Sequence, residues 1–86
     1  MLDAPPMSAR ILDLVRAAAP RLSEVAGDPL NVDLKDAGLA SVAAVRLMLE
    51  VEAAFDVEIP DSELTPQNFA TIANIENLVR RLKAAA

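Results

Sequence analysis

The run SVAAVRLMLEVEAAF at residues 41–55 constrains the fold of this chain most strongly. It contains no glycine or proline, and it is rich in alanine and leucine, which favour the helical backbone over the extended one. The only aromatic residues of the whole chain are Phe55 and Phe69, so its core is expected to be aliphatic. We therefore predict a helix over residues 41–55 and an all-helical fold.

The predicted helix at residues 41–55 carries more apolar side chains than one buried face needs. Two stripes at helical spacing lie on different sides of it. The first stripe consists of Ala44, Leu47, Met48, Val51 and Phe55, and the second consists of Val42, Val45 and Leu49. A helix in a small bundle cannot bury both completely, so one stripe is a candidate protein-binding surface. The alternative is that this helix is simply the central and most buried one.

Amphipathic patterns predict two further helices, one near each end of the chain. Ser8 is a candidate N-cap for the first, and Pro20 is expected to end it near Ala19, with a restart at Arg21. Its apolar stripe is Ile11, Leu12, Val15, Ala18, Leu22 and Val25. The last helix follows Thr71 as its N-cap. Its stripe is Ile72, Ile75, Leu78, Val79 and Leu82.

The segments between these helices have the composition of loops. Residues 27–40 form a long first loop with a helical turn at 33–37, pinned to the core by Leu30, Leu34 and Leu39. Val57 and Ile59 are expected to point inward, and Thr65 followed by Pro66 predicts a short helix to Phe69. The predicted fold is a four-helix bundle with three main helices and one short one. Residues 1–7 are expected to be a flexible tail.

Composition argues against several functions. The chain has no cysteine and no histidine, which removes thiol nucleophiles, the usual zinc ligand sets and the commonest general base. We therefore predict neither an enzyme nor a metal site. Six acidic groups and one basic group fall within residues 41–64, and there is no tryptophan or tyrosine to stack on bases. This favours a basic protein surface over nucleic acid as a partner, although acidic loops can also simply keep a small domain soluble.

The sequence also bears on location. No apolar run reaches the length of a membrane span, and the N-terminal residues lack the basic and apolar regions of a secretory signal. A membrane is therefore not expected among the partners, and a cytoplasmic location is predicted.

Three motifs in one register resemble those of the acyl and peptidyl carrier proteins. GLASV at residues 38–42 resembles the Gly-Leu-Asp-Ser-Leu motif at the start of that family's second helix. EAAF at residues 52–55 matches its Glu-x-x-Phe helix end, and IPD at residues 59–61 matches its Ile-Pro-Asp turn. The order and spacing match over residues 8–83. We expect the carrier domain to span residues 8–86.

The resemblance implies that Ser41 is the attachment point for 4′-phosphopantetheine, transferred from coenzyme A by a phosphopantetheinyl transferase. The terminal thiol of this arm would hold an acyl or aminoacyl group as a thioester, so the chain would be a phosphoprotein and a non-catalytic carrier. A phosphodiester suits the positive end of a helix dipole. Taken alone, Ser41 can also be an ordinary N-cap or a nucleophile. A nucleophile would need a base, and within the chain only Lys35 or Lys83 is available.

Departures from the common carrier pattern narrow the resemblance. Ala40 stands where the family has aspartate, which removes a carboxylate expected to help position the transferase and its metal ion. Arg46 and Ala53 stand where fatty-acid carriers have glutamates, so charge-steered docking to fatty-acid synthase enzymes is expected to be weaker. These departures, together with the sequence FATIANI at residues 69–75, resemble features of the free-standing aminoacyl carrier proteins. Those are loaded by seryl-tRNA-synthetase-like amino acid:carrier protein ligases.

Under this resemblance, a partner interface surrounds Ser41. It comprises Leu39, Ala40, Val42, Ala43, Val45, Arg46, Leu49 and Ile59. Ala43 and Ala44 would leave room at the base of the arm. The implied partners are the transferase, a loading ligase or acyl transferase, and a downstream acceptor enzyme, with a monomer expected when free. Two alternatives stay open: a conventional acyl carrier protein of fatty acid or polyketide synthesis, and an unmodified helical protein-interaction module.

Overall fold

The structure, a computed structural model, describes residues 6–24 and 27–85. Within them it has three α-helices, α1 (Met7–Ala18), α2 (Ser41–Phe55) and α3 (Ile72–Ala85). Three short 3-10 helices lie in the connections, namely η1 (Leu22–Glu24), η2 (Pro29–Asn31) and η3 (Asp61–Glu63). No strand occurs among the described residues, so the predicted all-helical class is confirmed, and α2 has the predicted bounds.

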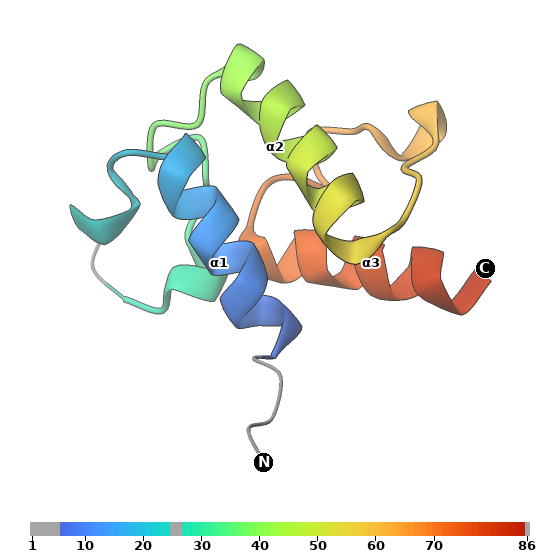
Figure 1. Cartoon of the computed structure of the whole chain (residues 1–86). Helices are drawn as coiled ribbons and strands as arrows, with labels where there is room; N and C mark the ends of the chain where they lie inside the picture. The colour runs from blue at the N-terminus through green and yellow to red at the C-terminus, as the bar shows by residue number, and fades with distance from the viewer. Residues whose placement is uncertain (1–5, 25–26, 86) are drawn as a thin grey trace.

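The core lies where the three helices meet. α1 packs against both α2 and α3, and the long first loop passes beside α1 and α3 (Figure 1). The buried helix side chains are those predicted from the apolar stripes: Ile11, Val15, Leu47, Val51, Phe55, Ile72, Ile75, Leu78 and Val79. Other stripe members, Leu12, Ala18, Ala44, Met48 and Leu82, are half-buried, Leu22 is buried in η1, and Val25 lies outside the described residues. The core is aliphatic, as expected.

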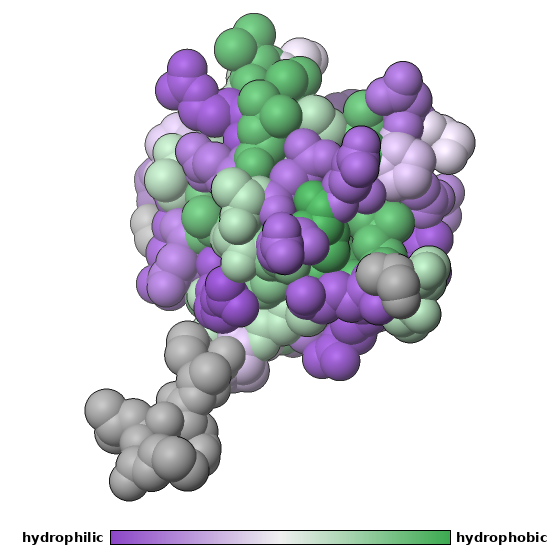
Figure 2. Space-filling model, turned by 45° about the vertical axis from the view of Figure 1, so that its right-hand side comes forward, coloured by the Kyte–Doolittle hydropathy of each residue, from purple (hydrophilic) through white to green (hydrophobic). Residues whose placement is uncertain are grey.

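Some apolar side chains stay at the surface. Figure 2 shows apolar side chains gathered at the top of the molecule, where the N-terminal end of α2 lies, with hydrophilic side chains on both sides. The large exposed apolar residues of α2 are Val42, Val45 and Leu49. Among the described residues, no helix is long and apolar enough to cross a membrane. The cytoplasmic location stays a prediction.

The start of α1 differs from the prediction. Pro6, not Ser8, holds the N-cap position, and its carbonyl accepts from Ala9 N at 3.1 Å and from Arg10 N at 3.2 Å. The Ser8 cap was wrong because the fixed φ of a proline, here −61°, lets the helix begin two residues earlier without a side-chain cap. The predicted end near Ala19 is confirmed. Residues 1–5 of the predicted tail lie outside the described residues.

The first loop is anchored as expected. Leu34 is fully buried, while Leu30 and Leu39 are half-buried against the core. The predicted turn at residues 33–37 closes through a hydrogen bond from Ala37 N to Asp33 O at 3.2 Å. Gly38 follows with φ 93°, a conformation that a residue with a side chain rarely adopts. This glycine turns the chain into the segment that precedes α2.

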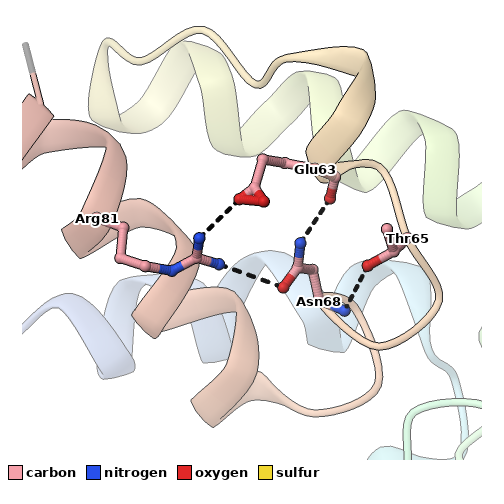
Figure 3. A network of polar contacts seen from close by, with 4 residues as sticks. All are labelled: Glu63, Thr65, Asn68 and Arg81. Atoms are coloured by element: carbon pink, nitrogen blue, oxygen red, sulfur yellow. Dashed lines mark hydrogen bonds and ion pairs between the residues drawn. The ribbon is translucent and has the colours of Figure 1, made fainter.

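The second loop contains the clearest error. The short helix predicted over residues 65–69 is a capped turn, in which Thr65 Oγ1 accepts from Asn68 N at 3.2 Å. The Asn68 side chain donates to Glu63 O at 2.7 Å and accepts from Arg81 of α3, which also pairs with the Glu63 carboxylate at 2.7 Å (Figure 3). These bonds to η3 and α3 hold the turn in place without helical i to i+4 bonds. A local pattern cannot reveal them.

The last helix starts as predicted. Thr71 Oγ1 accepts from Asn74 N at 3.0 Å, which is the N-cap bond expected for α3. Just before it, Ala70 O accepts from Leu34 N of the first loop at 2.8 Å. The two loops therefore support each other.

Candidate functional site at the start of the second helix

Ser41 is the first residue of α2, and it is exposed. The N-cap position belongs to Ala40, whose backbone is extended (φ −83°, ψ 163°), and no side chain caps this helix end. The interpretation of Ser41 as an ordinary N-cap is therefore wrong. A cap must stand one residue before the first helical residue, and Ser41 is already helical.

The electrostatic setting of Ser41 favours an anion. The first intrahelical bond of α2 runs from Ala44 N to Ala40 O at 2.8 Å, so the backbone N–H groups of Ser41, Val42 and Ala43 have no helical acceptor. The first turn also contains no acidic side chain that would offset the positive end of the helix dipole. A phosphodiester on the Ser41 hydroxyl fits this arrangement, because it places negative charge beside free N–H groups.

The structure does not pair Ser41 with either of the two lysines considered as a general base. Lys83 lies beside Asp56 and Val57 at the opposite end of α2, about 20 Å away at the rise of an α-helix. Lys35 lies in the first loop and makes no described side-chain hydrogen bond to Ser41. Among the described residues, no group of three acidic side chains is arranged to hold a metal ion. Within residues 6–24 and 27–85, the structure thus shows no arrangement that would activate Ser41 as a nucleophile.

The two apolar stripes of α2 have different environments. Leu47, Val51 and Phe55 are at most 3% exposed and form part of the core. The second stripe stays exposed, with exposed fractions of 77% for Val42, 56% for Val45 and 55% for Leu49. We call these three residues the contact stripe. The alternative that α2 is simply the central and most buried helix is therefore wrong, because this stripe is exposed and α1 is the helix that packs against both others. The exposed side chains begin beside Ser41.

Most of the other predicted interface residues surround the same helix end. Ala40 and Arg46 are exposed, and Leu39 and Ala43 are half-buried. Ile59 is the exception. Its side chain is only 6% exposed, and its N–H donates to Glu52 Oε2 at 2.7 Å. Ile59 therefore belongs to the core, which confirms the inward orientation expected from the sequence and corrects its place in the predicted interface.

Two acidic groups of the acidic middle segment are engaged within the chain. Glu52 accepts the Ile59 N–H bond, and Glu63 pairs with Arg81. The exposed acidic surface available to a basic partner is therefore smaller than the sequence count suggests.

One exposed apolar residue outside α2 was not predicted from the sequence. Leu64 is 38% exposed, and the sequence pattern placed it next to a helix start.

A shallow groove of about 300 Å³ runs along α2 beside the contact stripe. α1 contributes Ala17 and Ala18 to it. The other lining residues come from α2 and its cap: Ala40, Val42, Ala43, Arg46, Leu47 and Glu50. Of the two alanines expected to leave room near Ser41, Ala43 lines this groove and Ala44 does not. The sequence patterns did not predict that α1 contributes to this groove, because its contribution depends on how α1 and α2 pack.

Comparisons with known proteins point to one family. The family described as phosphopantetheine attachment site matches residues 10–82. Aminoacyl carrier protein 1 of Bradyrhizobium diazoefficiens is 41% identical over 70 residues, which covers 81% of this chain and 78% of that protein.

The solved structures that contain a similar chain include two complexes with a ligase. One is a complex of an engineered Bradyrhizobium japonicum glycine:[carrier protein] ligase with a carrier protein from Agrobacterium tumefaciens and AMP. The match has a TM-score of 0.74 and 38% identity and covers 86% of this chain and 99% of that one. The other is the Bradyrhizobium japonicum ligase complexed with glycylated carrier protein, with a TM-score of 0.66, 38% identity, and coverage of 85% and 99%.

Proposed function

The chain belongs to the phosphopantetheine attachment site family, and on that premise we propose that Ser41 is the residue that carries 4′-phosphopantetheine. Members of this family are non-catalytic carriers, and so is this protein. The observation that carries the proposal is the exposed Ser41 at the first position of α2, where its hydroxyl has no capping role. When bound, the arm supplies a thiol that holds a carboxylic acid as a thioester.

The residues around Ser41 position the attachment point and take no part in a chemical step. The unpaired N–H groups of the first turn stabilise the phosphodiester charge. The Gly38 turn and the half-buried Leu39 fix the direction from which the chain enters α2. Ala40 offers no carboxylate beside Ser41, so the matching transferase must recognise this helix end without one.

We further propose that the cargo is an aminoacyl group and that a ligase loads it. The proposal is supported by the similarity to a protein named as an aminoacyl carrier and to carrier chains solved with a glycine ligase. The contact stripe, with Leu39, Ala40, Ala43 and Arg46 beside it, would form the ligase interface. Three adjacent exposed aliphatic side chains on a rigid helix suit a partner groove, in the manner of helix-in-groove recognition. A downstream enzyme would then accept the aminoacyl group.

Intact-mass measurement tests the attachment. The purified chain is incubated with coenzyme A and a broad-specificity phosphopantetheinyl transferase, and we expect the mass to rise by one phosphopantetheinyl group. Ser41→Ala should show no gain, whereas Ser62→Ala, which alters an exposed serine of η3, should gain as the parent does. A wild-type chain that stays unmodified would contradict the proposal and favour the unmodified interaction module.

A loading assay tests the cargo. The holo chain is incubated with ATP, labelled amino acids and a glycine-type ligase, and in parallel with labelled malonyl-CoA and a malonyl transferase. We expect the holo chain to acquire label from an amino acid and little label from malonyl-CoA. Preferential malonyl loading would instead identify a conventional acyl carrier protein.

A further inference from the structure

The groove between α1 and α2 begins next to the attachment residue. Ala40 and Val42, the neighbours of Ser41 on either side, both line it. Its middle is small and apolar, formed by Ala17, Ala18 and Ala43. A chain attached to the Ser41 hydroxyl therefore starts at the mouth of the groove, and attachment keeps its concentration at this surface high.

The far end of the groove carries charge. Arg46 and Glu50 line it one turn apart on α2. Among the described residues, neither has an ion-pair partner within 4 Å, although i,i+4 neighbours of opposite charge often pair. Here arginine precedes glutamate, which is the less favourable order on a helix. Glu50 as a residue is half-buried, and its carboxylate has no ion-pair partner among the described residues.

The length of the arm matches the length of the groove. Glu50 follows Ser41 by nine positions, which corresponds to about 13 Å along the helix axis. From phosphorus to sulfur, the arm contains roughly 13 backbone bonds and spans about 15 Å at the spacing of an extended chain. An arm laid along α2 therefore brings its thioester level with Glu50. Arg46, five positions after Ser41, is about level with the first of the two amide groups of the arm, and a guanidinium is a donor that suits an amide carbonyl oxygen.

We propose that the α1–α2 groove is the resting site of the loaded arm and that Glu50 binds the α-ammonium group of an aminoacyl cargo. This rests on the proposed function, because it requires an arm on Ser41. A carboxylate beside an apolar groove attracts a cationic amine and gives a neutral acyl group no equivalent contact. The groove thus distinguishes aminoacyl from simple acyl cargo when the carrier is free of its partners.

The test compares three forms of the full chain. A broad-specificity transferase attaches the arm from coenzyme A, from a hydrolysis-resistant glycyl analogue of coenzyme A, or from the matching acetyl analogue, and intact mass verifies each product. Backbone amide signals are then compared by 15N NMR. We expect the glycyl form to shift the amides of Ala17, Ala18 and Ala43 at least twofold more than the acetyl form, with further shifts around Glu50.

Three variants sharpen this test. Glu50→Gln should remove the excess shift of the glycyl form. Glu58→Gln, which makes the same change at an exposed residue outside the groove, should retain it. Ala17→Leu changes an exposed residue and fills the groove, so it should reduce the shifts of both loaded forms while the fold is kept.

The outcomes separate this inference from the proposed function. A wild-type chain that gains no mass contradicts the attachment itself. A chain that gains the mass but shows equal shifts for the glycyl and acetyl forms overturns the role of Glu50 in selecting an aminoacyl cargo. Shifts along α3 in place of α1 overturn the groove assignment, and both results leave the attachment intact. Glycyl-specific shifts that persist in Glu50→Gln overturn the role of Glu50.

Discussion

The two ends of α2 are built in opposite ways. At the C-terminal end, Arg10 of α1 donates to Ala54 O at 2.6 Å and its guanidinium lies 4.4 Å from the centre of the Phe55 ring. Glu52 holds the following loop through Ile59 N, and Asp56 ends the helix in the left-handed conformation. At the N-terminal end, α2 has no side-chain cap, and Ser41 is exposed.

This difference separates stability from recognition along one helix. Contacts that fix α2 are concentrated where no attachment is proposed, and the end that carries Ser41 keeps its hydroxyl, its N–H groups and its apolar stripe free. A carrier must present the same residues to several enzymes in turn, so a rigid helix with one open end suits this role. The comparison predicts that substitutions at the two ends affect different measurements.

The largest expected effect is on folding, at the C-terminal end. Phe55→Ala removes a ring that is 3% exposed, and should lower the free energy of unfolding by about 3 to 5 kcal/mol because it leaves a cavity in a small core. Val45→Ala at the exposed end should change it by less than about 0.5 kcal/mol. Urea unfolding followed by circular dichroism measures both. Similar losses of unfolding free energy for the two variants would contradict the claim that the contacts fixing α2 are concentrated at its C-terminal end.

A smaller loss of stability is expected at Glu52. Glu52→Ala leaves the Ile59 N–H of a buried residue without its charged acceptor, which should cost about 1.5 to 3 kcal/mol of unfolding free energy. Glu50→Ala is the matched control, since Glu50 is also half-buried on α2 but holds no backbone group. Equal costs for the two would show that the Glu52 bond does not anchor the loop.

At the N-terminal end, the effect should appear in loading. Val45→Glu places a charge in the contact stripe and should reduce the rate of loading by the ligase about tenfold, which corresponds to about 1.4 kcal/mol, while the stability stays unchanged. Leu64→Glu makes a comparable change on an exposed apolar residue outside α2 and should load normally. If Val45→Glu loads as fast as the parent, the stripe is not the ligase interface.

The smallest effect is expected from restoring a cap. Ala40→Asp supplies a carboxylate that can accept from the free N–H groups of the first turn, and it should stabilise the fold by about 0.5 to 1 kcal/mol. This corresponds to a rise of a few degrees in Tm for a domain of this size. Ala53→Asp, an exposed position inside α2, serves as the control and should give no rise. Unchanged stability in Ala40→Asp would mean that the N–H groups of the first turn of α2 gain nothing from a side-chain acceptor.

The sequence predicted those parts of the structure that depend on local patterns. The bounds of α2, the Thr71 cap and the buried stripe of α3 follow from helical periodicity and capping, and the structure confirms them. The anchoring of Leu34 follows from an apolar residue within a polar loop, and it is confirmed as well. The Ser8 cap and the short helix at residues 65–69 were wrong. The first depends on Pro6, and the second was replaced by bonds to η3 and α3.

Only part of the candidate site could be predicted from the sequence, because only part of it depends on local patterns. The position of Ser41 and the existence of a second stripe can be read from spacing alone. Which stripe is exposed and the groove that joins Ala17 to Glu50 depend on the packing of α1 against α2. No pattern within one helix contains that information.

The central claim is that Ser41, and no other serine, carries the arm. Proteolytic digestion of the modified chain followed by fragmentation of the peptides by mass spectrometry locates the modification directly. We predict that the phosphopantetheinyl mass is found on the peptide containing Ser41 and on that residue within it, while Ser8, Ser23 and Ser62 are unmodified. Modification at one of those three serines, or at several sites with Ser41 unmodified, would contradict the claim.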